Sequence, residues 1–148
     1  MSLKRKIIFA FLLLTLSFIG WLYYHLFHSR TSLSVVEGVS SLDLDSSYDI
    51  QTLQDDWADP SATNSDGEAF FKVNLTAEQC SLLIAEAAKL NYKPCPVIYS
   101  GVHGLPPDIT AILNGVHRIS VGDRDDRDVH VSAIDITNKK LYVFFRFM

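Results

Sequence analysis

An uncharged run from residue 7 to residue 27 constrains this chain more than any other feature. The run consists mostly of Ile, Leu, Phe, Ala, Trp and Tyr, and as a helix it would span roughly 30 Å, the thickness of a bilayer's hydrocarbon core. The aromatic residues Trp21, Tyr23 and Tyr24 gather at its far end, where amphipathic rings favour the lipid headgroups. The sequence therefore predicts a single transmembrane helix that meets the lipid bilayer through residues 7–27.

Basic residues give this helix an expected orientation. Lys4, Arg5 and Lys6 precede the apolar run, and only Arg30 follows it closely. Because basic residues favour the cytoplasmic side, we expect residues 1–30 to form a cytosolic basic tip and an uncleaved anchor, with the C-terminal domain outside the cytoplasm. The alternative is a cleaved signal peptide, but such peptides have a shorter apolar core and a cleavage site of small residues.

Residues 31–68 differ sharply in composition from the rest of the chain. They contain nine Asp and Glu residues and no Lys or Arg, among many Ser, Thr and Gln residues. A segment with few apolar residues and uncompensated charge buries too little apolar surface to offset the conformational entropy that it would lose on folding. We therefore expect an acidic, flexible linker.

One part of this linker has a helical pattern. Ile50, Leu53 and Trp57 stand at i, i+3 and i+7, and the Asp59–Pro60 step would end a short helix. Such a helix over residues 46–58 would dock on a partner protein or pack on its own domain. The pattern leaves both alternatives open.

Residues 69–148 carry the regular patterns of a small folded domain. Thr76 and Gln79 form a capping-box pattern at the start of an amphipathic helix over residues 77–90. The predicted apolar stripe of this helix consists of Cys80, Leu83, Ile84, Ala87 and Leu90. Asn138–Lys139 predicts a tight turn between the last two strands. The expected order is strand 69–74, helix 77–90, strand 96–99, a helix from 107 to 113, and strands 117–121, 129–136 and 141–147. This order predicts an α+β domain of two layers, with a mainly antiparallel sheet and two helices on one face.

The domain contains both cysteines of the chain, Cys80 and Cys95. A disulfide between them would stabilise a core of this size in an oxidising compartment, provided that the chain doubles back along the helix. The alternative is two buried thiols, because cysteine is a common core residue.

No set of residues forms a recognisable catalytic or metal-binding motif. Ser100 and His103 share a glycine-containing loop that could serve a hydrolase, but the chain has no G-x-S-x-G elbow and no Cys-His signature. His103, His117 and His130 lack the short spacings typical of metal ligands. We therefore expect no enzyme activity, metal, cofactor or small-molecule substrate.

The loop from Asp123 to Asp128 resembles a calcium loop only superficially. With Asp123 counted as the first position, the sixth and twelfth positions, where an EF-hand needs Gly and Glu, hold Asp128 and Ile134. Arg124 and Arg127 could instead pair with carboxylates of a partner protein. Residues 69–148 carry only one more base than acids, so nucleic-acid binding is not expected.

These expectations favour a membrane-anchored, extracytoplasmic protein-binding module. Its candidate partner-binding residues are Ile50, Leu53, Trp57, Arg124 and Arg127. We expect it in a bacterial inner membrane with a periplasmic domain, as an accessory subunit of an envelope assembly or secretion machine. The alternatives are an immunity-type inhibitor of an envelope-acting toxin, a small membrane-anchored hydrolase, and a stress-related protein that acts mainly through its helix.

Overall fold

The computed structural model describes residues 3–28, 31–56, 67–97, 104–122 and 128–147. The chain divides into two compact units, Met1–Thr31 and Ser32–Met148, which are described separately. The first unit contains one helix and the second contains a small α+β domain.

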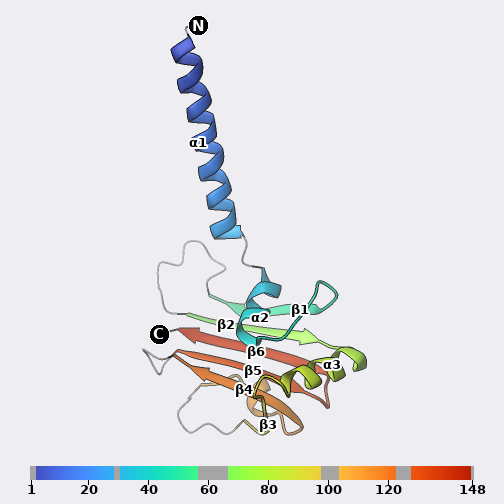
Figure 1. Cartoon of the computed structure of the whole chain (residues 1–148). Helices are drawn as coiled ribbons and strands as arrows, with labels where there is room; N and C mark the ends of the chain where they lie inside the picture. Colours follow the sequence, from blue (N-terminus) through green and yellow to red (C-terminus); the bar gives the residue numbers. More distant parts are fainter. Residues whose placement is uncertain (1–2, 29–30, 57–66, 98–103, 123–127, 148) are drawn as a thin grey trace. The chain divides into compact units, whose positions relative to one another are not determined.

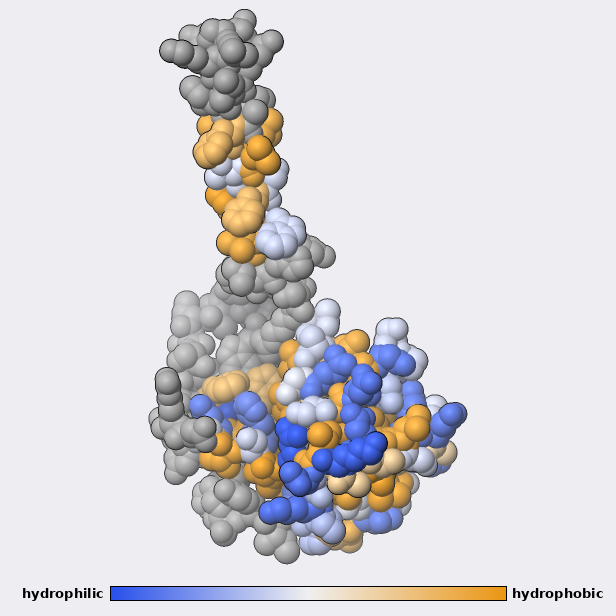
Figure 2. All heavy atoms as spheres, viewed as in Figure 1, coloured by the Kyte–Doolittle hydropathy of each residue, from blue (hydrophilic) through white to orange (hydrophobic). Residues whose placement is uncertain are grey.

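The first unit is built on α1 (Leu3–His28), a helix of 26 residues. Its side chains between residues 11 and 23 are exposed, and they include consecutive apolar residues such as Phe11, Leu12, Leu13 and Leu14. Figure 2 shows hydrophobic side chains at the surface of this helix. Over the described residues, no helix is both long enough and apolar enough to cross a membrane, so the transmembrane prediction is unconfirmed.

The second unit is built on a six-stranded antiparallel sheet with the strand order β1-β2-β6-β5-β4-β3 (Figure 1). This confirms the expected α+β class. β6 lies between β2 and β5, as its apolar residues on both faces predict. The strands are β1 (Asp49–Asp55), β2 (Gly67–Asn74), β3 (Lys93–Pro94), β4 (Gly115–Val121), β5 (Val129–Asp135) and β6 (Lys140–Phe147).

The described residues of this domain form three helices: α2 (Ser32–Ser40), α3 (Ala77–Ala87) and α4 (Pro107–Thr110). The predicted capping box of α3 is confirmed. The Thr76 side chain accepts a hydrogen bond from the Gln79 backbone N–H at 3.1 Å, and the Gln79 side chain accepts one from the Thr76 N–H at 2.9 Å. These bonds satisfy amides that the first helical turn leaves without partners.

α3 and α4 pack on opposite faces of the sheet, so the prediction of two helices on a single face is wrong. Alternate residues of β6 face opposite ways: Leu141, Val143 and Phe145 pack with α2 and α3, whereas Tyr142 and Phe144 pack with α4. We call these two groups the α3-side core and the α4-side core. The sequence showed two apolar faces on β6, but it did not show that α4 lies on the face opposite α3.

The flexible linker expected over residues 31–68 is wrong for residues 32–56. These residues form α2, a loop and β1, and the side chains of Val36, Leu42 and Leu44 are fully or almost fully buried in the α3-side core. Three well-buried apolar side chains suffice to attach the segment to the core, although most of its carboxylates are exposed. The mean composition of the segment concealed this pattern.

The expected helix over residues 46–58 is also wrong. β1 pairs with β2 from Asp49 to Asp55, so Ile50 and Leu53 lie in a strand. Trp57 lies outside the described residues.

Candidate functional site

Four further residues singled out from the sequence also lie outside the described part of the chain, namely Ser100, His103, Arg124 and Arg127. Of the expected partner-binding residues, the structure describes Ile50 and Leu53 and places both in β1. Ile50 is half-buried against the α3-side core. Leu53 is 47% exposed and is therefore the one available to a partner.

β1 is the outermost strand on its side of the sheet. Five of its seven residues are exposed, and the pairing with β2 shifts between Thr52 and Gln54, where Leu53 forms a bulge. α2 is linked to the strand by a hydrogen bond between Ser32 Oγ and Thr52 Oγ1 at 3.1 Å. Among the described strands, only β2 pairs with β1. The outer edge of such a strand carries backbone donors and acceptors that can accept an added strand.

A second surface feature is a groove of about 590 Å³ between α3 and the loop over residues 41–48. We call it the acidic groove. Leu82 lies in it with 59% of its surface exposed, although the predicted apolar stripe of α3 omits this residue. The signal in the sequence that could have indicated this site is Leu82, a leucine that lies outside the predicted apolar stripe. The groove is lined by Asp43, Tyr48, Leu82, Leu83, Ala85, Glu86, Lys89 and Leu90.

Hydrogen bonds to helix side chains fix the loop that forms one wall of the acidic groove. The Asp43 backbone N–H donates to Glu86 Oε1 at 2.9 Å, and the Leu44 N–H donates to Glu37 Oε1 at 3.3 Å. The Leu42 N–H donates to Ser40 Oγ at 3.2 Å. Because the wall is held before any ligand arrives, little ordering entropy is lost when one binds.

The electrostatics of the acidic groove appear in the pKa of Tyr48. Burial raises this pKa, and the negative charges of Asp45, Glu86 and Asp43 raise it further. Hydrogen bonds from Ser47 lower the pKa of the Asp45 carboxyl, which keeps it ionised. Three carboxylates therefore act on one phenol at the rim of the groove.

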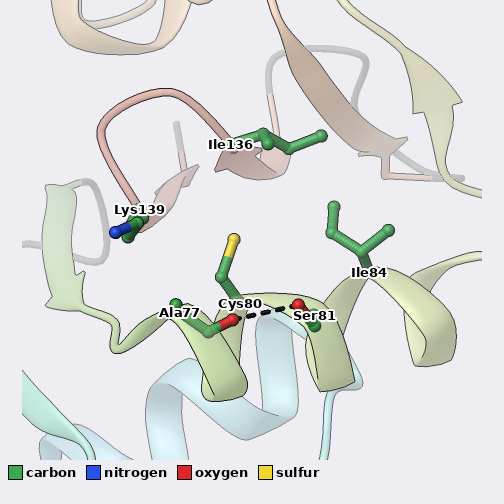
Figure 3. Close-up of a pocket in the computed structure, with 6 residues that line it drawn as sticks. All are labelled: Ala77, Cys80, Ser81, Ile84, Ile136 and Lys139. Carbon is green, nitrogen blue, oxygen red and sulfur yellow. Dashed lines mark hydrogen bonds between the residues drawn. The ribbon is translucent and has the colours of Figure 1, made fainter.

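A smaller cavity of about 400 Å³ lies at the start of α3 (Figure 3). Cys80 points into it between Ile136 and Lys139, and its side chain is only 6% exposed. Burial raises the pKa of the Cys80 thiol, and nearby Lys139 only partly opposes this. A neutral, buried thiol is a poor nucleophile, so this cavity does not form a reactive-cysteine site.

Of the two alternatives for the cysteines, the structure shows free thiols at Cys80 and Cys95 and not a disulfide. Cys80 belongs to the α3-side core, whereas Cys95 packs against the α4-side core on the other face of the sheet. Cys95 Sγ lies 3.9 Å from His117 Nδ1. Burial raises the pKa of Cys95 and lowers that of His117, so the two form a neutral pair and not a thiolate–imidazolium pair.

The two described histidines of the domain, His117 and His130, lie apart. His117 is beside Cys95, while His130 contacts the rings of Phe145 and Phe147 on the opposite face, at centroid distances of 6.1 and 5.3 Å. In the described ranges, no three His, Cys, Asp or Glu residues are arranged to hold a metal ion.

Comparisons of this chain with protein-family models, with curated proteins and with solved structures find no match.

Proposed function

We propose that this protein is a membrane-anchored module that binds another envelope protein through β1. The observation that carries the proposal is the exposure of β1 at the edge of the sheet, with Leu53 47% exposed. A partner segment in extended conformation would add to this edge by backbone hydrogen bonds, and Leu53 would supply an apolar contact. Such a strand addition needs no preformed pocket.

Two features support an anchor in the first unit. Residues 7–27 carry no formal charge, and the apolar side chains of α1 from Phe11 to Tyr23 are exposed. Consecutive residues point in different directions around a helix, so this apolar surface is not confined to one stripe. An all-round apolar helix is stable in lipid, and the basic residues at its start favour a cytoplasmic N-terminus.

The bacterial inner membrane, with a periplasmic domain, is the setting we propose. There the domain would act as an accessory subunit of an envelope assembly or secretion machine. The fixed attachment of α2 and β1 to the sheet would hold the binding edge on a rigid support, which reduces the ordering cost of docking.

Cross-linking followed by affinity purification of the full-length tagged protein from its native membrane tests the binding role. Leu53→Asp places a charge on β1, and Leu113→Asp is the matched control, because Leu113 is 78% exposed outside the strand. We expect wild type and Leu113→Asp to recover the same stoichiometric partner and Leu53→Asp to lose it. Equal recovery by all three proteins would contradict binding through β1.

Alkaline carbonate extraction tests the anchor. We expect the full-length protein to stay in the membrane fraction, whereas removal of residues 1–30 should release it. Release of the full-length protein by carbonate would contradict the anchor while leaving the binding experiment interpretable.

A further inference from the structure

We propose that the acidic groove is a second binding surface, which takes a basic amphipathic segment of a partner protein. The segment would place an apolar side chain against Leu82 and Leu90 and would place Lys or Arg residues near Asp43, Asp45 and Glu86. The proposal rests on the proposed function for the choice of a protein as ligand, and its test uses the proposed anchor, which carbonate extraction checks separately, to hold the protein in nanodiscs. It concerns a surface outside β1, and its test measures that surface directly.

The apolar part of the groove is supplied by α3. Leu82 is largely exposed, while its chain neighbour Leu83, which also lines the groove, is 1% exposed and belongs to the α3-side core. The groove therefore has an apolar lining that is packed into the core, together with one leucine side chain that is exposed to solvent. An apolar partner side chain placed there would remove both surfaces from water.

The charge of the groove favours a cation. Asp43, Asp45 and Glu86 all raise the pKa of Tyr48, so all three negative charges lie near the phenol of this residue. The groove is also lined by one base, Lys89, which stands three residues after Glu86 on the same helix and offsets part of its charge. The remaining charge is negative, and a partially enclosed apolar surface strengthens the field felt by an approaching Lys or Arg.

The carboxylates are also held in place. Glu86 accepts the Asp43 N–H, and Asp45 accepts the Ser47 N–H at 2.8 Å. A carboxylate has acceptor positions for more than one donor, so each remains able to accept from a partner's ammonium or guanidinium group. The groove therefore combines fixed carboxylate acceptors with an apolar surface. A partner segment with one basic and one apolar side chain can contact both.

Other occupants match this surface less well. A second copy of the chain would bring its own net charge of −4 to an acidic groove. Anionic lipid headgroups would be repelled for the same reason. A basic amphipathic segment has the complementary charge and supplies the apolar side chain.

A peptide-binding titration tests the proposal on the full-length protein in nanodiscs of neutral phosphatidylcholine. The probe is a short synthetic peptide with Leu on one helical face and Lys on the other. A peptide with Glu in place of Lys and empty nanodiscs are the controls. We expect saturable binding of the Lys peptide alone, weakening as salt screens the charges.

Variants then locate the binding surface. Leu82→Ser removes the exposed apolar contact, and Glu86→Gln removes a charge while keeping an oxygen that can accept the Asp43 N–H. Each should weaken binding by about fivefold, the factor that corresponds to roughly 1 kcal/mol. Leu113→Ser and Asp108→Asn make the same chemical changes at exposed sites outside the groove, and they should leave the affinity unchanged.

Several results would overturn the proposal. These are absence of binding to wild type, equal binding of the Glu peptide, equal binding to empty nanodiscs, and equal affinity in the Leu82→Ser and wild-type proteins. Dimerisation that Leu82→Ser abolishes would assign the groove to a second copy and overturn it as well. Loss of the cellular partner in Leu53→Asp with unchanged peptide binding would separate the two surfaces, and would leave the groove supported.

Discussion

The Tyr92 hydroxyl lies 2.6 Å from Ser132 Oγ and also donates to the Ser40 carbonyl oxygen at 2.9 Å. Since the phenol has one hydrogen and it goes to Ser40, the Ser132 hydroxyl donates to the Tyr92 oxygen. These two bonds join the end of α2, the segment after α3 and the interior of β5. They are one reason why the segment around α2 belongs to the domain.

Tyr92→Phe should lower the free energy of unfolding by about 1–3 kcal/mol, because it leaves buried polar groups of Ser40 and Ser132 without this partner. Urea denaturation of the full-length protein measures the change. Tyr48→Phe is the control, and it should change stability by less than about 0.5 kcal/mol, as is usual at a surface site. Equal losses in the two variants would contradict a structural role for the Tyr92 hydroxyl.

Tyr92 also predicts a change of stability at alkaline pH. Burial raises the pKa of Tyr92 from its usual value of 10.0 to about 12. The folded protein therefore favours the neutral phenol, and this contribution is complete below pH 10 and is lost as the pH rises towards 12. The difference in unfolding free energy between wild type and Tyr92→Phe should narrow over that interval. Denaturation curves recorded at several pH values would contradict the prediction if the difference stayed constant.

His130 predicts a loss of stability at mildly acidic pH. Burial lowers its pKa below the usual 6.5; the charge of Asp128 partly opposes this shift, and the charge of Arg118 adds to it. The folded state favours neutral imidazole, so the contribution is present above pH 6.5 and is lost as the pH falls through the folded-state pKa. His130→Gln should flatten the decline of unfolding free energy below pH 6.5. An unchanged decline would assign it to other groups, such as His117, whose pKa is also lowered by burial.

Phe71 should be among the positions least tolerant of truncation. It is fully buried in β2 and stacks on Phe145 with ring centroids 6.4 Å apart. Phe71→Ala should cost about 3–5 kcal/mol. If that variant does not fold, Phe71→Leu provides a milder change that can be measured by denaturation. Leu113→Ala, at a 78% exposed site, should stay within about 0.5 kcal/mol of wild type.

Both cysteines should react with maleimide in denatured protein that was purified without a reductant. Both are free, and they belong to opposite faces of the sheet. In native protein Cys95 should react faster than Cys80, which is only 6% exposed. Intact-mass measurement counts the added labels. Labelling that requires a reductant would show that the cysteines are bridged.

Local sequence patterns predicted several elements correctly. The capping box of α3, the apolar face formed by Cys80, Leu83 and Ala87, and the turn before β6 each depend on residues a few positions apart. Lys139 adopts a positive φ of 51° in that turn, as a tight connection between two strands requires. These elements could be predicted because the determining contacts lie within one turn or one strand.

The sequence by itself thus determined α3, the central strands β2, β5 and β6, and the exposed apolar helix α1. Only the tertiary structure decided that α2 and β1 join the domain, that the cysteines lie on opposite faces, and that an acidic groove exists. The groove depends on bonds such as Asp43 to Glu86, which join residues 43 positions apart in the chain. Periodicity identifies a buried face but carries no information about which distant segment covers it, because hydrophobic burial is non-directional.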